Sequence, residues 1–465
     1  MRKTNLVERA VTAEKRAEYE HKKRKEAERK WKKALLKIKK LENIIRKFHN
    51  ENTSSSALPV YLKSAIKSPN RLPVGINPRG KPKGGNGSTR KIPEKVDKKV
   101  RVEFTKEYLR KLKEKHGERL EIRQVKLYVW EIPEIKAYTT EFTVDRAYLG
   151  KKLIAQAVNP KLPKRGQIGN NLVAFIEEAK IAFAGSYDKV SVFTDNLFGV
   201  SFSQQAMNDC IERTGEEFEP EYNELKEELR KSDSAGIDET SWPVNGKNWF
   251  LWIFVTTNII FFSIENSRGK KILAKILGTL FNGGVISDCY SIYRGFAKWF
   301  QKCWAHLLRS TYNLYLKNKR KDIAKLHRWL SNLFEKMKKF LEENPPSDER
   351  GKKYKLYGKE LQRIINYPWK SEEAKRIVKN RLKAFEGHWL TAIKVPGVKL
   401  TNNDAERPIR SAIPTRKLLG GHRTERGAKN YAILMSLRMT WKLRGLSPYH
   451  TLIQKLREIN VNMTL

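Results

Sequence analysis

The sequence predicts an α/β domain with a long helical insertion, preceded by a basic N-terminal region that is mainly helical. Three observations predict this fold class. Runs of β-branched and aromatic residues between residues 237 and 288 are typical of strands. A helical stretch from about 305 to 400 follows these strands. The first 50 residues are strongly basic and almost free of glycine and proline, which favours an exposed helix.

Composition points to a polyanionic partner. A chain of 465 residues is too long for one ordinary core, so two or three domains with extensions are expected. Lysine and arginine number 95 against 51 aspartate and glutamate, which gives a net charge of +44. Such an excess favours nucleic acid as the partner. A generally solvated basic surface, as in ribosomal or thermophile proteins, is the alternative.

The cysteine count and the apolar runs indicate a cytoplasmic protein with no membrane partner. Only Cys210, Cys289 and Cys303 occur, without a paired C-x-x-C spacing, so neither a disulfide framework nor a cysteine-rich zinc site is expected. The longest apolar run, residues 249–262, is broken by Asn258 and is typical of paired strands. Association with the nucleoid is the expected location.

Residues 1–50 are predicted to form a basic helix that dimerises. They carry 18 basic and 7 acidic residues. An a/d seam with 3-4-3-4-3 spacing predicts a coiled coil and hence a homodimer or higher oligomer. A single helix docked on its own protein is the alternative. The seam consists of Trp31, Ala34, Ile38, Leu41, Ile45 and Phe48.

Residues 51–105 are predicted to be a flexible basic linker, because a segment rich in serine, proline and glycine buries too little apolar area to order itself. Residues 51–100 add 11 positive and 3 negative charges. Arg79, Lys81 and Lys83 are candidate DNA contacts in this linker. A soluble tether whose lysines only keep it solvated remains an equal alternative.

Residues 106–234 are predicted to be an accessory region that binds DNA. A hairpin is expected from Glu121–Trp130 and Lys136–Val144, which alternate in polarity. Further along, Gly199 can form a turn and Ser203 can cap the helix that follows. Helix, glycine turn and capped helix indicate a helix-turn-helix. Many helical hairpins touch no DNA, so the alternative is a structural hairpin.

Residues 235–465 are predicted to form the catalytic domain, with its helical insertion at about 305–400. Three successive strands, a helix and a further strand follow the order of a ribonuclease H-like fold. The predicted elements are strands at Ile237–Val244, Trp249–Thr257 and Ile259–Glu265, a helix at Gly269–Leu280 and a strand at Val285–Asp288.

Three acidic residues are candidates for a metal site. Asp238 lies on the first predicted strand, Asp288 ends the fourth, and Glu406 follows a helix start that Asn403 or Asp404 can cap. Two-metal phosphoryl transfer needs such converging carboxylates. Because adjacent strand residues face opposite sides, Glu239 cannot share the site with Asp238 and is the reserve candidate. Taken singly, each acid is more often a turn or cap residue.

Four motifs, in this order, resemble the DDE transposases of the insertion sequence 66 family. They are Ile237-Asp238-Glu239-Thr240, Ser287-Asp288-Cys289-Tyr290-Ser291-Ile292-Tyr293, Cys303-Trp304-Ala305-His306-Leu307-Leu308-Arg309 and Asn402-Asn403-Asp404-Ala405-Glu406-Arg407-Pro408-Ile409-Arg410. The resemblance extends from about residue 150 to the C-terminus. It implies a ribonuclease H-like catalytic domain, with an insertion before the glutamate, that acts on DNA ends with two Mg²⁺ or Mn²⁺ ions.

Carried over residue by residue, the resemblance implies that Asp238, Asp288 and Glu406 are catalytic and hold the metal ions. His306 is expected to position the scissile phosphate, and the alternative is a helix-start histidine that packs beside Trp304. The arginines of the last motif, Arg407 and Arg410, can grip phosphate or simply neutralise the neighbouring acids. The cysteine-ligated zinc module of the family is missing, because residues 51–150 contain no cysteine.

The function that follows is Mg²⁺-dependent cleavage of double-stranded DNA at element ends, with strand transfer into target DNA. A structure-specific ribonuclease H-like nuclease is one alternative. A domesticated copy that binds DNA without cutting it is the other.

Overall fold

The computed structural model describes residues 28, 93–117, 120–132, 134–293 and 295–461. The seam from Trp31 to Phe48 lies outside these residues, as do Arg79, Lys81 and Lys83. The coiled coil and the DNA contacts of the linker therefore stay predictions. Among the residues that are described, no helix is both long enough and apolar enough to span a membrane.

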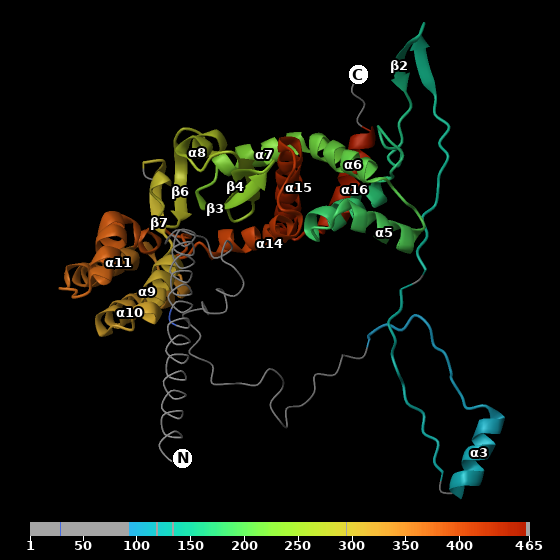
Figure 1. Ribbon diagram of the computed structural model, residues 1–465, viewed down its shortest axis with the longest axis horizontal. Coiled ribbons are helices and arrows are strands. Elements are labelled where there is room, and N and C mark those ends of the chain that lie inside the picture. Colours follow the sequence, from blue (N-terminus) through green and yellow to red (C-terminus); the bar gives the residue numbers. More distant parts are fainter. Residues whose placement is uncertain (1–27, 29–92, 118–119, 133, 294, 462–465) are drawn as a thin grey trace, which may run out of the picture.

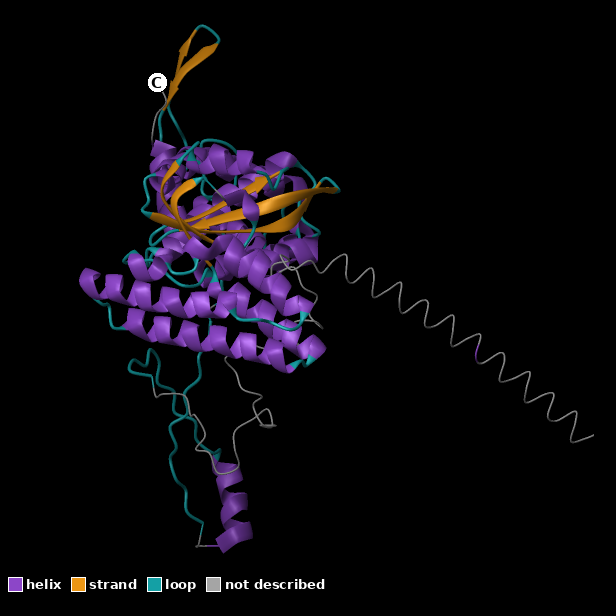
Figure 2. Ribbon diagram, turned by 90° about the vertical axis from the view of Figure 1, so that its left-hand side faces the viewer, coloured by secondary structure: helices purple, strands orange, loops and turns teal. Residues whose placement is uncertain are grey.

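A five-stranded mixed sheet forms the centre of the molecule, with helices on both of its sides (Figures 1 and 2). The strand order is β5-β4-β3-β6-β7. Within this sheet β3, β4 and β5 pair antiparallel, whereas β6 runs parallel to β3 and β7 runs parallel to β6. The strands are β3 (Ser234–Val244), β4 (Lys247–Val255), β5 (Ile260–Glu265), β6 (Phe281–Ser287) and β7 (Ala297–Lys302).

The strands predicted for this sheet are present, and the sheet has one further strand that was not predicted. The three runs between residues 237 and 265 form β3, β4 and β5, and the run before Asp288 forms the end of β6. All of β5 and the second half of β4 are buried. Continuous burial is expected of strands covered on both faces, which explains their unbroken apolar character. The added strand is β7.

Helices from both ends of the domain pack on this sheet into one apolar core. Helix α14 contacts β3 and β4, and α15 contacts β5. Helix α8 buries Ile272, Leu273, Ile276 and Leu277, the apolar face of an amphipathic helix. The helix was predicted to continue to Leu280, but it ends at Leu277, and Leu280 is exposed. The helices concerned are α7 (Glu219–Arg230), α8 (Lys270–Leu277), α14 (Asn403–Leu419), α15 (Glu425–Leu443) and α16 (Pro448–Val461).

The chain between β7 and α14 is helical and has an apolar core of its own. Trp304 and Trp389 meet edge to face in it, with ring centroids 5.4 Å apart. The Trp304 indole N–H donates to the carbonyl of Trp389. The long α10 buries one apolar stripe onto α9 and α11. The main helices are α9 (Trp304–Asn318), α10 (Lys321–Glu342), α11 (Ser347–Asn366), α12 (Glu372–Ile377) and α13 (Thr391–Lys394).

The hairpin predicted from Glu121 to Val144 is wrong. Residues 120–132 and 134–145 contain no strand, and the hairpin is formed instead by β1 (Arg146–Leu149) and β2 (Lys152–Gln156). Its two-residue turn includes Gly150, whose φ is +60°. Two-residue hairpin turns need such positive φ angles, which glycine adopts without strain. This hairpin projects from the body of the molecule, as does α3 (Lys106–His116) (Figure 1).

The helix, glycine turn and capped helix of the accessory region are present. Helix α5 (Tyr187–Phe198) ends at Gly199, which has φ +66°, and α6 (Gln204–Glu217) begins after Ser203. The Ser203 side chain accepts a hydrogen bond from the amide of Ala206. Contact of these helices with DNA stays a prediction.

A buried ion pair joins the accessory helices to the helices on the sheet. Arg438 of α15 contacts Glu177 at the end of α4 (Asn170–Glu177) and Glu178 directly after it. Burial raises the pKa of Glu177 to about 7, an effect that Arg438 opposes and Glu178 reinforces. Deprotonation of Glu177 therefore destabilises the folded state.

Glu177→Gln is expected to stabilise the protein at pH 8 and to change little at pH 5. The folded protein binds the Glu177 proton more tightly than the unfolded chain, where the pKa is 4.5. The contribution of Glu177 to the free energy of unfolding is thus largest below pH 4.5 and falls as the pH rises to about 7. The loss is about 3 kcal/mol at most, since one pKa unit corresponds to about 1.4 kcal/mol. Thermal melting at both pH values measures it, with the exposed Glu224→Gln as control. An equal gain at both pH values would contradict the prediction.

Candidate active site

Two of the predicted acids lie at one edge of the sheet, the edge at which the parallel pairing of β3 with β6 ends. β3 and β6 are parallel, and their last paired residues are Gly236 and Ile286. Asp238 lies two residues further along β3, and Asp288 lies two residues after Ile286, directly beyond the end of β6. Since the carboxyl ends of parallel strands meet at the same edge, these two carboxylates are brought together by register alone.

The third acid, Glu406, is carried to the same edge by α14. The side-chain amide of Asn402 donates to the carbonyl oxygen of Ile237 at 2.7 Å, directly before Asp238. Further along the helix, Arg416 donates to the Thr240 hydroxyl at 2.8 Å. Two attachments along β3 fix the helix, and Glu406 lies in its buried first turn. Asn402 occupies the N-cap position without a side-chain capping bond, so capping by Asn403 or Asp404 was wrong.

The charges at this edge interact strongly. The pKa of Asp238 lies well above its usual range, first because the carboxyl is buried and next because Glu239 lies beside it. His306 opposes the shift, whereas Glu406 and Asp288 add to it. Several carboxylates therefore compete for charge in a small buried volume. A bound cation would relieve their repulsion.

Glu239, the reserve candidate, is already satisfied by protein groups. Its carboxylate accepts hydrogen bonds from Arg268, at 2.7 Å from Nε, and from the Tyr293 hydroxyl, also at 2.7 Å. Burial raises the pKa of Glu239, as does Asp288, and Arg268 opposes them. Arg268 also lies over the ring of Tyr290, 4.3 Å from its centroid. Both carboxylate oxygens of Glu239 are therefore held by protein groups beside the candidate site.

Glu406 contrasts with Glu239, because both of its buried carboxylate oxygens lack a hydrogen-bond partner among the described residues. Charged groups approach it without bonding: His306 Nδ1 lies 3.6 Å from Oε1, and Arg309 and Arg410 each lie 3.6 Å from Oε2. Burial alone would lower the pKa of His306, but Cys303 and Glu406 raise it to about 9. His306 is therefore more readily protonated than a free imidazole.

Two further residues at this edge were missed by sequence reasoning. Lys302, the last residue of β7, is buried and donates to the Asp288 carbonyl at 2.8 Å and to the Ser287 hydroxyl at 3.1 Å. It ties the loop that carries Asp288 to the neighbouring strand. No sequence signal identifies it. Cys303 is buried beside His306 and Glu406, and its C-x-x-H spacing to His306 was the available signal.

The predicted phosphate-binding arginines are on the outer side of α14. Arg407 is exposed, and the Arg410 side chain retains 62% of its exposure while approaching Glu406. Both can therefore reach a ligand at the surface and lie beside the acidic edge. Their contact with DNA stays a prediction.

Gly236→Ala is expected to destabilise the protein by about 1–3 kcal/mol, the usual cost of overpacking a core. An added Cβ at this strand position would lie 2.6 Å from Asn402 Oδ1, the side chain that attaches α14 to β3. Thermal melting measures the loss. The control is Gly351→Ala in α11, where an added Cβ meets nothing within 4 Å. If both variants melt alike, the approach of Asn402 to β3 is not tight.

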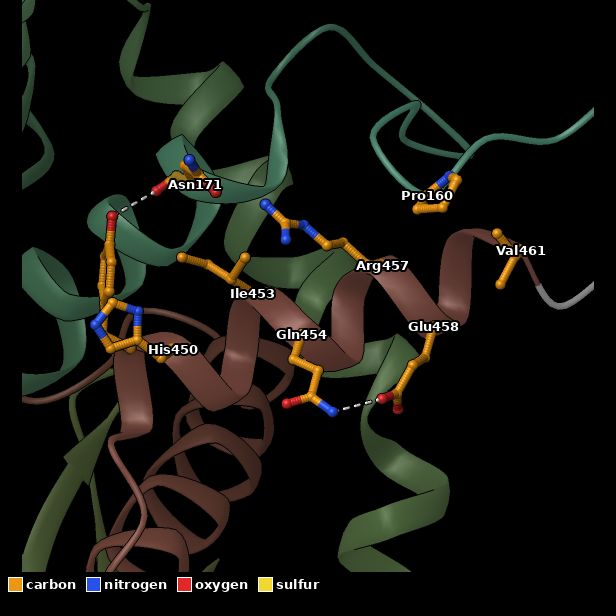
Figure 3. Close-up of a pocket in the computed structure, with 9 residues that line it drawn as sticks. Pro160, Asn171, His450, Ile453, Gln454, Arg457, Glu458 and Val461 are labelled. Carbon is orange, nitrogen blue, oxygen red and sulfur yellow. Dashed lines mark hydrogen bonds between the residues drawn. The ribbon is translucent and has the colours of Figure 1, made fainter.

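A surface pocket elsewhere in the structure is separate from this edge. It lies between α16 and the start of α4, and its lining includes Pro160, Asn171, Arg457 and Glu458 (Figure 3). The Tyr449 hydroxyl donates to the carbonyl of Asn171 across one end of it. None of the acidic residues of the sheet edge lines this pocket.

Comparison with known proteins matches the segment that contains the candidate site. Residues 165–430 match the family described as "Transposase IS66 family", and this range includes Asp238, Asp288 and Glu406. The chain is also 25% identical over 353 residues to the "Uncharacterized protein y4qI" of Sinorhizobium fredii. That match covers 67% of this chain and 64% of the relative, so the chain spans less than two thirds of the relative's length.

Proposed function

Since this chain belongs to the Transposase IS66 family, we propose that it cuts DNA at the ends of a mobile element and joins the freed 3′-hydroxyl to target DNA. Both steps are phosphoryl transfers at one site formed by Asp238, Asp288 and Glu406. The observation that supports this site best is the buried carboxylate of Glu406, whose oxygens accept no hydrogen bond from the described residues, together with the raised pKa of the Asp238 carboxyl. Carboxylate oxygens without hydrogen bonds can serve as ligands of a metal ion.

We infer a ribonuclease H-like fold for the catalytic domain. Three antiparallel strands, a helix and two parallel strands give the sheet order β5-β4-β3-β6-β7. This order supports the inference, because it places the first strand of the domain at the centre, next to the strand that ends at Asp288. In open sheets, ligands bind beyond the carboxyl ends of such strands.

The residues at this edge fit Mg²⁺ or Mn²⁺. Asp238, Asp288 and Glu406 offer only oxygen ligands, which hard divalent cations prefer. These residues would hold two such ions, which would supply activation of the attacking oxygen and stabilisation of the leaving oxygen. The chain itself positions the ligands: Lys302 holds the backbone of Asp288, and Asn402 holds the helix that carries Glu406.

Basic groups around the acidic edge suit a DNA backbone. His306 and Arg309 balance the charge of Glu406 inside the site, while Arg407 and Arg410 reach the surface beside it. A scissile phosphate near Glu406 would meet these cations and gain charge-assisted hydrogen bonds. The substrates are double-stranded element ends and target DNA, and two or more copies of the chain act together on the nucleoid.

Incubation of the purified full chain with end-labelled duplex tests this function. One duplex carries the DNA that flanks the gene, and a second carries the same bases in shuffled order. Mg²⁺ should yield a cut product with a 3′-hydroxyl and a joined product from the flanking duplex alone, and chelation should remove both. Equal cutting of both duplexes would indicate a nuclease instead. Binding without any product would indicate a DNA-binding protein that does not cut.

A further inference from the structure

A second set of potential metal ligands lies against the proposed catalytic glutamate. The thiol of Cys303, the imidazole of His306 and a carboxylate oxygen of Glu406 all lie within 4.8 Å of one another. Thiolate and imidazole are ligands that zinc and similar cations prefer, and Mg²⁺ does not. The cluster therefore differs in chemistry from the oxygen ligands Asp238 and Asp288.

Three elements of the fold hold this cluster in place. Cys303 precedes α9 and His306 lies in its first turn, so the three-residue spacing puts both side chains on one face of the helix start. The backbone amide of Cys303 donates to the carbonyl of Ser287 at 2.8 Å, which ties it to β6. The amide of Asn402 donates to Cys303 Sγ at 3.1 Å, which ties it to α14. A sulfur that accepts an amide N–H is well placed to act as a thiolate ligand.

Three potential ligand atoms of the other two residues have no hydrogen-bond partner in the part of the chain that the structure describes. His306 Nδ1 and both carboxylate oxygens of Glu406 are buried without one among the described residues. Buried polar atoms nearly always have a hydrogen-bond partner. Three buried atoms without one, close together, therefore indicate a binding site for a ligand. Arg309 and Arg410 compensate the charge of Glu406 only from 3.6 Å, on the Oε2 side. Oε1 is left facing His306.

We propose that Cys303, His306 and Glu406 bind one zinc-class cation, such as Zn²⁺ or Co²⁺, with water in the remaining position. Binding releases to solvent any proton that the thiol or the imidazole still holds, since both ligands must be deprotonated. The ion takes Glu406 away from Asp238 and Asp288. It is thus an inhibitory site, and this consequence alone depends on the proposed function.

Titration of the metal-free full chain with Co²⁺ tests the site by its absorption spectrum. We expect one equivalent to produce thiolate-to-cobalt charge-transfer absorption in the near ultraviolet. Cys303→Ser should abolish that absorption, while Cys289→Ser and Asp238→Asn keep it. His306→Gln, as a second ligand variant, should weaken Co²⁺ binding at least tenfold. An absent band in the parent chain, or an unchanged band in Cys303→Ser, would overturn the proposal.

The inhibitory consequence has its own readout in the parent chain. One equivalent of Zn²⁺ should raise the Mg²⁺ concentration needed for half-maximal DNA cleavage at least tenfold. No change in that concentration would show that Glu406 is not shared, and the inhibitory part of the proposal would be wrong. If the parent cuts no DNA with Mg²⁺ at all, the proposed function fails, while the Co²⁺ titration still decides the site.

Discussion

Asp238→Asn, Asp288→Asn and Glu406→Gln are each expected to abolish DNA cleavage and strand transfer together. Each change keeps the shape of the side chain and removes a charge that would hold a metal ion. Losses on the order of 10⁴-fold or more are expected, as when one member of a catalytic unit is removed. DNA binding should survive, because the exposed arginines of α14 and the basic N-terminal region are unchanged. Gel analysis of end-labelled DNA measures cleavage, joining and binding.

Two controls make this expectation specific. Double variants of the three acids should be little worse than the single ones, because members of one unit do not contribute additively. Glu239→Gln should keep most of the cleavage, since Arg268 and Tyr293 already hold Glu239. Cleavage by Asp238→Asn together with inactivity of Glu239→Gln would show that the site uses the other face of β3.

Arg268→Met is expected to produce the largest loss of stability, about 3 kcal/mol. Removing one partner of a buried ion pair costs about 3–5 kcal/mol, because the remaining charge is left buried. Glu239 has 3% of its side chain exposed, whereas Arg268 retains 27%, so the lower end of that range applies. Tyr293 alone would then support the Glu239 carboxylate. Thermal or urea unfolding of the full chain measures the loss.

The double variant Arg268→Met with Glu239→Gln should recover most of that loss, because no charge is left unpaired. Arg328→Met on α10 is the matched control, since Arg328 is exposed and surface changes usually stay within about 0.5 kcal/mol. If Arg268→Met melts like this control, Glu239 does not depend on the ion pair.

Local sequence pattern predicted β4 and β5 well, because the second half of β4 and all of β5 are buried and rich in apolar residues. It did not predict β7, whose residues include Lys298, Gln301 and Lys302. Gln301 is buried only because the helical insertion supplies its partners. Its side chain accepts from the amide of Ala392 and donates to the carbonyl of Trp389, both about 90 residues away. Tertiary contacts of this kind leave no periodic signal.

The hairpin error has a local cause. The residues from 121 to 144 alternate in polarity, which resembles a pair of strands. The pairing occurs instead around Gly150, where a two-residue turn with positive φ is available. The residue that allows the turn therefore determined where the hairpin forms more strongly than the alternation in polarity did.

The acidic residues of the candidate site were accessible from motifs, but their surroundings were not. Parallel pairing of β3 with β6 explains how Asp238 and Asp288 come together. The contact between Cys303 and Glu406 joins residues about 100 positions apart, through the amide of Asn402. Neither spacing nor composition could identify which of Glu239 and Glu406 would accept no hydrogen bond from the described residues. That difference arises from Arg268 and Tyr293, which pair with Glu239 alone.

Binding of Mn²⁺ to the full chain tests most directly whether Asp238, Asp288 and Glu406 form one metal site. The loss of the electron paramagnetic resonance signal of free Mn²⁺, in the presence of duplex DNA, gives the affinity and the number of bound ions. The parent chain and Glu239→Gln should bind Mn²⁺ alike, and each of Asp238→Asn, Asp288→Asn and Glu406→Gln should lose the tightest binding. Equal binding by the parent and all three variants would contradict a shared metal site.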